Sequence, residues 1–340
     1  MKICLLFEFY NSMGGTIRKI LGKNGVITSY ENQKKILEKL NIDYTTHWDK
    51  SCDILQINYP GLTTFQTIKK ARKEGQKIIL WAHTTAEDFR NSFFLSNLLS
   101  PVLKKFLAYY LDLADIIFCP SQHGKNRIVS YGIPEKKIVV MSNGVDTRFF
   151  KPNKKKREEG RKKFSMQGVS VGTLGIVIKR KGIDIFLRLA KKYPKNNFYW
   201  FGKIFSQFLA RSLPPKTPQN AKFTGQIASE ETSLALNALD IFLFPSLEEN
   251  QGIAILEAAS AGLAILCRDL PAYNGWLVHG ENCLKARNNK EFEKYLNLLI
   301  KNKGLRKRLG ENALKMAKKE DIANVAKRVK KVYDSLLQES

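Results

Sequence analysis

The chain contains little of what would place it in a membrane, around a structural metal or in the secretory pathway. Only five of its 340 residues are cysteine, and they form neither a Cys-x-x-Cys pair nor a cluster with histidine. This spacing matches no common zinc-binding motif and favours free thiols in a reducing cytosol. No apolar run reaches the length of about eighteen residues that spans a bilayer, and no secretory leader opens the chain. We expect a cytoplasmic protein without a spanning helix.

Two motifs of nucleotide-dependent enzymes are also missing. No Gly-x-Gly-x-x-Gly follows a predicted strand, which argues against a nicotinamide-dependent oxidoreductase. No Asp-x-Asp occurs near a strand end, so we expect no divalent metal to bridge phosphates and no other cofactor.

Acidic side chains are scarce relative to basic ones. The 57 Lys and Arg residues outnumber 31 Asp and Glu, which gives a net charge of +26 spread along the chain. Such a surface attracts acidic lipid headgroups, nucleic acid or charged sugars, although a lysine-rich genome would produce the same bias. A nucleic-acid-binding protein is the leading non-enzymatic alternative. Aromatic residues do not interleave with the lysines as a stacking platform requires, so we expect no nucleic-acid partner.

Short apolar runs alternate with helical patterns in both halves of the chain. In the first half, apolar runs and helical spacings alternate at residues 1–10, 29–40, 52–58, 62–75, 77–83 and 115–119. In the second half, the alternating segments are residues 168–178, 182–192, 197–201, 230–239, 241–244 and 253–261. The alternation predicts an α/β fold with parallel sheets.

The charge pattern divides these two series. Residues 151–163 are charged and almost free of apolar side chains, which predicts an interdomain linker. We therefore expect Rossmann-like domains at residues 1–150 and 164–320 with a cleft between them. A final helix at residues 321–340 could cross back to the first domain.

Two carboxylates flank one strand-to-helix loop of the second domain. Glu249 follows the apolar run 241–244, and Glu257 lies about two turns into the helix predicted at 253–261. Gly252 lies near the start of that helix, where free N–H groups and the positive end of the helix dipole attract an anion. The arrangement suits a phosphate held by backbone amides, with sugar hydroxyls on either side.

This order of strand, Pro-Ser, Glu, Gly, helix and Glu resembles the Glu-x7-Glu signature of retaining GT-B glycosyltransferases, especially family 4. The resemblance implies a GT-B fold and transfer of a sugar from a nucleotide sugar with retention of configuration. It implies that Glu249 binds the donor sugar and Glu257 the ribose. Donor contacts are expected from the intervening residues Asn250, Gln251, Gly252 and Ile253.

The same resemblance assigns a catalytic role to three further residues. His83 ends the apolar run 77–83, and similar enzymes carry a histidine here that contacts the transferred sugar. Lys179-Arg180-Lys181-Gly182 opens a helix, where cations stabilise a departing diphosphate. Lys181 matches the lysine of the family. The family arginine is missing, and Arg180 is the residue that could replace it. A solvated basic cluster and a structural histidine are the plain alternatives.

Two glycine-containing loops complete the predicted donor site. Gly14-Gly15 follows the first strand and resembles a loop that faces the donor phosphate, although a Gly pair is often just a turn. Gly225-Gln226 resembles the loop against which the base packs.

A segment rich in aromatic and aliphatic residues suggests contact with a membrane. The phrase at residues 82–93 resembles bacterial glycosyltransferases that act on glycosyl-diacylglycerol. Just after it, Phe93, Phe94, Leu98 and Leu99 are predicted to face lipid, with Lys104 and Lys105 meeting anionic headgroups. The alternative is a buried helix. We expect Val102, Phe106 and Tyr110 to point inward.

The resulting hypothesis is a retaining, metal-independent hexosyltransferase. It would move glucose or galactose from a UDP-sugar to a glycolipid such as monoglycosyl-diacylglycerol, at the inner face of the cell membrane. The alternative enzyme would act on a soluble or polysaccharide acceptor. The oligomeric state stays open.

Overall fold

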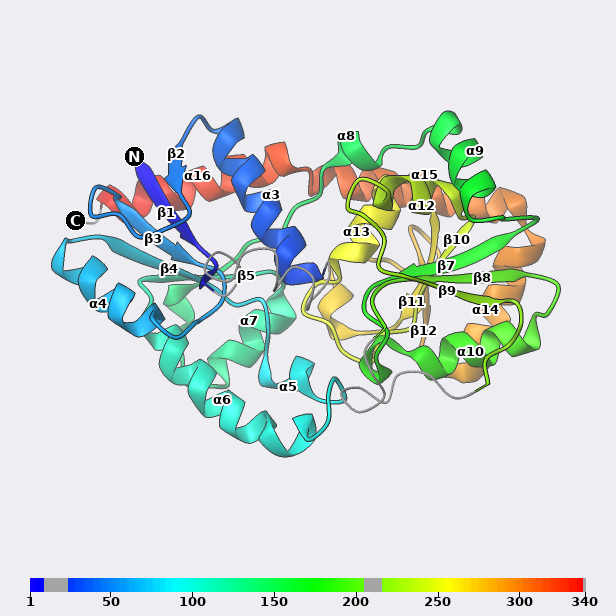
Figure 1. Cartoon of the computed structure of the whole chain (residues 1–340), viewed down its shortest axis with the longest axis horizontal. Helices are drawn as coiled ribbons and strands as arrows, with labels where there is room; N and C mark the ends of the chain where they lie inside the picture. Colours follow the sequence, from blue (N-terminus) through cyan, green and yellow to red (C-terminus); the bar gives the residue numbers. More distant parts are fainter. Residues whose placement is uncertain (9–23, 205–215, 339–340) are drawn as a thin grey trace.

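The chain forms two lobes, each built around one parallel sheet of six strands (Figure 1). A computed structural model describes residues 1–8, 24–204 and 216–338. Helices lie on both sides of each sheet, as the alternation of strands and helices predicts. This confirms the GT-B type of architecture, with two Rossmann-like lobes.

The N-terminal lobe has the strand order β2-β1-β3-β4-β5-β6. Its strands are β1 (Lys2–Leu6), β2 (Asp43–Thr45), β3 (Ile54–Ile57), β4 (Lys77–Trp81), β5 (Ile116–Cys119) and β6 (Ile138–Val140). Its helices are α3 (Gly25–Lys39), α4 (Thr64–Lys73), α5 (Ala86–Phe89), α6 (Ser96–Asp112), α7 (Gln122–Val129) and η1 (Glu135–Lys137). The next helix, α8 (Thr147–Phe150), packs against α12 (Thr232–Ala238) and α13 (Ile253–Ser260) of the C-terminal lobe.

The C-terminal lobe has the order β12-β11-β10-β7-β8-β9. Its strands are β7 (Ser170–Leu174), β8 (Asn197–Phe201), β9 (Ala221–Gly225), β10 (Ile241–Phe244), β11 (Ala264–Arg268) and β12 (Leu284–Ala286). Its first helices are α9 (Lys154–Lys163), η2 (Lys179–Lys181), α10 (Ile183–Lys192), α12 (Thr232–Ala238) and α13 (Ile253–Ser260). The chain continues with η3 (Pro271–Tyr273), α14 (Asn289–Lys301), α15 (Lys303–Lys319) and α16 (Ile322–Gln338).

The central strands are apolar on both faces because helices cover both sides of a parallel sheet. All four residues of β3 and all four of β10 are buried. Apolar runs of this kind identified β1, β3, β4, β5, β8 and β10 from the sequence. Each sheet has a switch point, where the order of the strands along the chain changes direction. It lies between β1 and β3 in the N-terminal sheet and between β7 and β10 in the C-terminal sheet. Ligands of open parallel sheets bind at such switch points, beyond the carboxyl ends of the strands.

The segment predicted as a linker is largely helical. Its residues from Lys154 onward form α9, which packs against α12 of the C-terminal lobe. Arg157 and Arg161 both pair with Asp240, at 2.7 and 3.3 Å. A Cβ at Gly160 would lie 2.6 Å from the Leu234 carbonyl oxygen, so glycine permits the close approach of the two helices.

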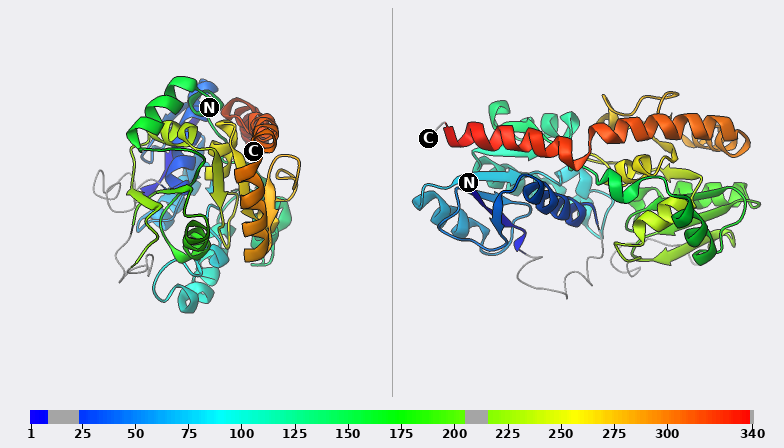
Figure 2. Two further views of the ribbon diagram at one scale, coloured as in Figure 1. Left: turned by 90° about the vertical axis from the view of Figure 1, so that its right-hand side faces the viewer. Right: turned by 90° about the horizontal axis from the view of Figure 1, so that it is seen from above.

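The final helix returns to the N-terminal lobe. Figure 2 shows α16 running on from α15 over both lobes. Val325, Val329 and Leu336 of α16 belong to the same buried cluster as Ile3 and Leu5 of β1. The Tyr333 hydroxyl donates to Gln56 Oε1 of β3 at 2.6 Å. Apolar packing and this buried hydrogen bond tie the last helix to the first sheet.

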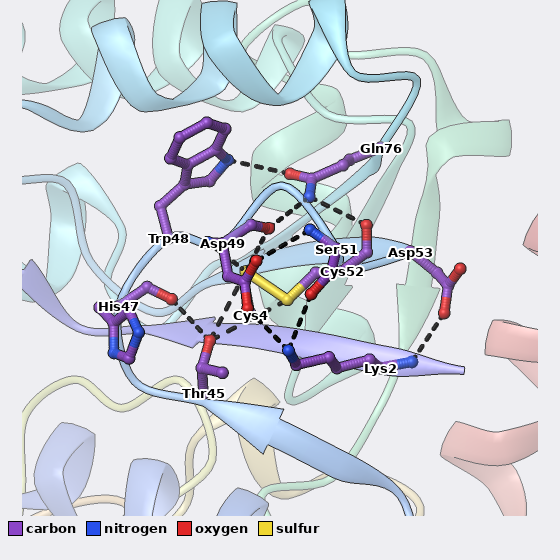
Figure 3. The surroundings of a disulfide bond; sticks show 10 residues. All are labelled: Lys2, Cys4, Thr45, His47, Trp48, Asp49, Ser51, Cys52, Asp53 and Gln76. Atoms are coloured by element: carbon purple, nitrogen blue, oxygen red, sulfur yellow. Dashed lines mark hydrogen bonds and ion pairs between the residues drawn. A yellow bond between two sulfur atoms is a disulfide. The ribbon is translucent and has the colours of Figure 1, made fainter.

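One cysteine pair corrects the expectation of free thiols. Cys4 on β1 and Cys52, just before β3, form a disulfide with their Cα atoms 5.9 Å apart (Figure 3). The cause is the parallel register, which places Ile3 opposite Ile54 and brings residues 48 positions apart into contact. Spacing in the sequence does not reveal such a pair. Cys119, Cys267 and Cys283 are free and buried.

Within the described ranges, none of the helices is both long and apolar enough to cross a bilayer.

Candidate active site

The two lobes enclose one large cleft of about 680 Å³. Its N-terminal wall includes Phe7, Tyr59 and His83, which follow the carboxyl ends of β1, β3 and β4. Its C-terminal wall includes Gly175 after β7 and Glu249 after β10. The cleft thus lies where the switch points of both sheets face each other, which is the expected place for a ligand.

Lys181 and Glu249 form an ion pair at the centre of the C-terminal wall. Ser246 Oγ donates to the same Glu249 oxygen at 2.6 Å, and the Lys181 ammonium lies 5.2 Å from the centre of the Phe244 ring. Burial opposes ionisation of Glu249, but Lys181 and Arg180 outweigh it and hold the pKa of this carboxyl below its usual range. Burial also lowers the pKa of Lys181, and Glu249 partly offsets that effect.

Arg180 lies at the junction of the two lobes. Its Nε donates to Ser92 Oγ at 3.0 Å, and its backbone N–H donates to the Asn91 carbonyl at 3.1 Å. Its guanidinium also donates to the Glu248 carbonyl at 2.9 Å and approaches Glu249 to 3.8 Å. Arg180 also lines the cleft, and its bonds to Asn91 and Ser92 hold the loop after α5 against the C-terminal lobe. Its predicted role at the diphosphate stays a prediction.

The start of α13 faces the cleft without a capping side chain. Gly252 is its N-cap residue, with φ at 82°, a left-handed conformation that favours glycine. The Ile255 N–H donates to the Gly252 carbonyl at 2.9 Å, and no side chain caps the first turn. The N–H groups of Ile253 and Ala254 are therefore the ones that can meet an anion. The contrast is α3, whose start also lines the cleft but whose Val26 and Ile27 N–H groups donate to Asn24 Oδ1.

Asn250 and Gln251 line the cleft, but their side chains reach across to the other lobe. Asn250 Nδ2 donates to the Ala82 carbonyl at 2.9 Å. Gln251 Oε1 accepts from the Asn143 N–H at 3.0 Å and from its side-chain amide at 2.7 Å, and Gln251 Nε2 donates to Ser142 Oγ at 2.8 Å. The prediction of donor contacts stays open for both residues. Their observed bonds hold the lobes together at the base of the cleft.

His83 lines the cleft from the N-terminal side. Its ring stacks on Trp81 with the centroids 5.3 Å apart, and its Nε2 lies 2.8 Å from Asn58 Oδ1. Burial lowers the pKa of His83 to about 3, so the ring is neutral at physiological pH. A neutral ring in this position can exchange hydrogen bonds with a sugar hydroxyl.

Of the remaining predicted donor residues, some line the cleft and others do not. Ile253, Glu257 and Gln226 line the cleft. Gly225 ends β9, and its carbonyl accepts from the Gly202 N–H at 2.9 Å, so it supports the wall without lining it. Gly14 and Gly15 lie outside the described residues.

Asp88 lines the cleft and was missed as a site residue. It belongs to α5, where its Oδ2 accepts from the Thr85 N–H at 3.2 Å and Thr85 Oγ1 accepts from its own N–H at 3.2 Å. Burial raises the pKa of Asp88 to about 6, partly opposed by Arg180. The signal that could have found it is a carboxylate soon after a strand end, five residues beyond His83.

The helix α6 exposes an apolar patch on the N-terminal lobe. Phe93, Phe94, Leu98 and Leu99 are exposed, as predicted. The prediction that Val102 and Phe106 point inward was wrong, because both are exposed; Tyr110 is buried. The buried stripe of α6 runs through Ser96, Ser100, Leu107, Tyr110 and Leu111, which turns the other face outward.

The α6 patch comprises the exposed side chains Phe93, Phe94, Leu95, Leu98, Leu99, Val102, Phe106 and Tyr109. Lys105 is exposed beside it, whereas the Lys104 ammonium lies 5.0 Å from the centre of the Tyr131 ring. Eight exposed apolar side chains on one helix and its leading loop exceed what a solvated surface normally shows.

No group of three or more His, Cys, Asp or Glu side chains in the described part of the chain is arranged to hold a metal ion.

Comparison with known sequences defines the class of protein. The family described as Glycosyltransferase Family 4 matches residues 34–149, and Glycosyl transferases group 1 matches residues 154–316. The first match covers the N-terminal lobe from within α3, and the second covers the C-terminal lobe as far as α15. Each lobe thus carries a glycosyltransferase family-model domain, which defines the class as a glycosyltransferase with the GT-B fold.

Individual relatives agree with this assignment. The chain is 29% identical over 327 residues to a processive diacylglycerol alpha-glucosyltransferase from Acholeplasma laidlawii, covering 94% of this chain and 96% of the relative. It is 26% identical to an alpha-galactosylglucosyldiacylglycerol synthase from Streptococcus pneumoniae, over 77% of this chain and 73% of that one. Anabaena HepE, solved with UDP and glucose, has the same fold, with a TM-score of 0.73 at 15% identity over 98% of this chain and 100% of HepE.

Proposed function

We propose that this glycosyltransferase moves a hexose, glucose or galactose, from a UDP-sugar to a membrane glycolipid such as monoglycosyl-diacylglycerol. The observation that carries the proposal is the joint presence of a charged cleft and the α6 patch. The Lys181–Glu249 pair and the uncapped start of α13 line the cleft, while the patch lies on the lobe that supplies the opposite wall. A donor site and a lipid surface on one molecule suit an enzyme with a water-soluble donor and a membrane-bound acceptor.

Each part of the donor site has a chemical task in this proposal. The diphosphate binds at the start of α13, where backbone N–H groups and Lys181 balance its charge. Glu249 and His83 bind hydroxyls of the sugar from opposite walls, and Glu257 binds the ribose. Positioning and electrostatic stabilisation of the departing diphosphate then supply most of the catalysis. Relatives that are named for UDP, glucose or glycosyl-diacylglycerol support this choice of substrates.

Retention of configuration and independence from metal belong to the same proposal. The two relatives above are named for alpha-linked products, and the common UDP-hexoses carry their phosphate in the α configuration. An α-linked product would therefore mean retention. Lys181 and the α13 amides supply positive charge at the diphosphate without an ion.

The α6 patch would hold the enzyme on the inner face of the cell membrane. Apolar side chains such as Phe94 and Leu98 can enter the interfacial region, and the net charge of +26 favours an anionic leaflet. An acceptor headgroup would then enter the cleft from the N-terminal side.

A donor and acceptor screen tests the proposal. The full-length protein is incubated with UDP-glucose or UDP-galactose and anionic vesicles that contain monoglucosyl-diacylglycerol, with and without EDTA. We expect one of the two donors to give an α-linked diglycosyl lipid, identified by mass spectrometry and the anomeric coupling constant, at the same rate in EDTA. Turnover only on soluble oligosaccharides would contradict the acceptor, and loss of turnover in EDTA would contradict metal independence.

A further inference from the structure

Asp88 has a buried carboxylate oxygen that the fold does not use. The side chain is 8% exposed and lines the cleft. Its Oδ2 takes part in the cap of α5, whereas its Oδ1 has no hydrogen-bond partner within the ranges that the structure describes. A buried polar atom without a partner costs stability unless a ligand satisfies it.

The part that Asp88 plays in the cap of α5 does not explain why this residue is a carboxylate. Asp88 is the N3 residue of the capping box of α5, a position where a neutral side-chain amide also accepts from the N-cap N–H. Asparagine could therefore keep this bond without a buried negative charge. Burial is the main effect that opposes the ionisation of Asp88, and Glu249 and Glu248 add to it, while Arg180 offsets these effects only in part. The hydrogen bonds of the Arg180 guanidinium go to Ser92 and the Glu248 carbonyl. The charge is therefore retained at an energetic cost.

Asp88 lies between the lipid-facing surface and the donor wall. It belongs to α5, which Figure 1 shows between α6 and the C-terminal lobe. Phe89 and Phe93 line the same side of the cleft, with their rings 6.4 Å apart, and Phe93 is also part of the α6 patch. Phe93 thus joins the α6 patch to the cleft wall that also carries Phe89 and Asp88, while Lys181 and Glu249 belong to the wall of the other lobe.

We propose that Asp88 Oδ1 binds a hydroxyl of the sugar on the acceptor lipid, one other than the hydroxyl that attacks the donor. This inference rests on the proposed function and narrows its acceptor to lipids whose headgroup carries a sugar. A carboxylate is a strong acceptor for a sugar hydroxyl, and the bond would supply the partner that Oδ1 lacks. It would also orient the headgroup, so that its attacking hydroxyl faces the anomeric carbon.

The test separates acceptor binding from the donor half of the site. Three full-length proteins are compared: wild type, Asp88→Asn and Thr85→Ala. Asparagine keeps an oxygen for the α5 cap but removes the charge, whereas Thr85→Ala weakens the same cap and leaves Asp88 intact. For each protein, transfer to monoglucosyl-diacylglycerol in vesicles is measured beside hydrolysis of the UDP-hexose without acceptor and the Kd of UDP.

We expect Asp88→Asn to lower kcat/KM for the acceptor about tenfold or more, mainly through KM, because hydrogen bonds to charged groups contribute on that scale. Donor hydrolysis and the UDP Kd should change less than about twofold, and Thr85→Ala should retain most of the transfer. The inference would be overturned if Asp88→Asn lost transfer and donor hydrolysis equally, or if its transfer were unchanged. It would also be overturned if Thr85→Ala lost as much transfer as Asp88→Asn. If wild type neither binds UDP nor hydrolyses a UDP-hexose, the proposed function itself fails.

Discussion

Lys181 and Glu249 form an ion pair across the point where the C-terminal sheet reverses its strand order. Lys181 belongs to the loop after β7 and Glu249 to the loop after β10, which are neighbouring strands of the sheet. The pair therefore depends on the topology of the lobe. Each member favours the charged form of the other in a buried place. In the proposed function, Lys181 would exchange its partner for a phosphate and Glu249 for a sugar hydroxyl.

Removing one member of this pair should impair both catalysis and stability. We expect Lys181→Met and Glu249→Gln each to lower kcat/KM at least about a hundredfold, the scale of losing a preorganised electrostatic contact. Lys181→Met should also lower the free energy of unfolding, by at most about 3–5 kcal/mol, because the buried Glu249 carboxylate then keeps only Arg180, at 3.8 Å, as a nearby cation.

The double variant Lys181→Met/Glu249→Gln separates the two effects. It removes both charges, so its unfolding free energy should recover towards that of wild type, as measured by urea denaturation, while its activity stays at least as low as in the single variants. A double variant as unstable as Lys181→Met, or losses below about fivefold in both single variants, would contradict this role of the pair.

The bonds of Gln251 to the other lobe predict a structural effect. Gln251→Ala leaves the buried N–H of Asn143 without its acceptor, so the free energy of unfolding should fall by about 1–3 kcal/mol. Loosening of the lobes should also increase the radius of gyration in small-angle scattering, and UDP should reverse part of that increase. The exposed Gln122 is the matched control, and Gln122→Ala should change neither quantity. Equal stability of the two variants would argue against a role in holding the lobes.

His83 predicts a dependence of stability on pH. The folded-state pKa is about 3, while the ordinary value in an unfolded chain is about 6.5. Between these values the unfolded state binds the additional proton, so stability falls as the pH is lowered from about 6.5, by at most about 1.4 kcal/mol per unit. Asp88, with a raised pKa, contributes the opposite slope between about pH 4 and 6.

The measurement is therefore a difference between two proteins. The unfolding free energy of wild type minus that of His83→Gln should decrease as the pH falls from 7 to 5. A difference that stays constant with pH would show that His83 is not held neutral by burial.

The α6 patch predicts binding to anionic vesicles. Phe94→Ser/Leu98→Ser removes the two patch side chains with 64% and 72% exposure, and it should reduce the bound fraction in flotation assays about tenfold or more, because each contributes apolar area to the interface. Val278→Ser/Leu298→Ser, at two exposed apolar positions of the C-terminal lobe, is the control and should bind like wild type. Equal binding by both double variants would contradict membrane contact through α6.

Much of the fold follows from local patterns. The fully buried run at β10 and the glycine before α13 are visible in the sequence, and both elements occur where we expected them. The short strands β2 and β12 were missed, because three residues with at most two buried side chains carry no clear period. The outward turn of Val102 was missed because α6 is apolar on most sides, so its buried stripe depends on what packs against it.

The predicted residues that line the cleft belong to single strand-to-helix segments, either just after the strand or in the helix that follows it. Glu249, Lys181 and His83 each follow a buried strand, and all three line the cleft. The contacts of Gln251 with Asn143 join residues 108 positions apart, and the Cys4–Cys52 bond depends on strand register. Such pairings arise from tertiary structure, which the spacing of residue types does not encode.

A structure of the protein with bound UDP tests the central claim most directly. We expect the diphosphate at the start of α13, within hydrogen-bonding distance of the first N–H groups of that helix, with Lys181 turned from Glu249 towards the phosphate and Glu257 at the ribose. UDP bound away from Lys181 and Glu257, or no binding at millimolar UDP, would contradict the account.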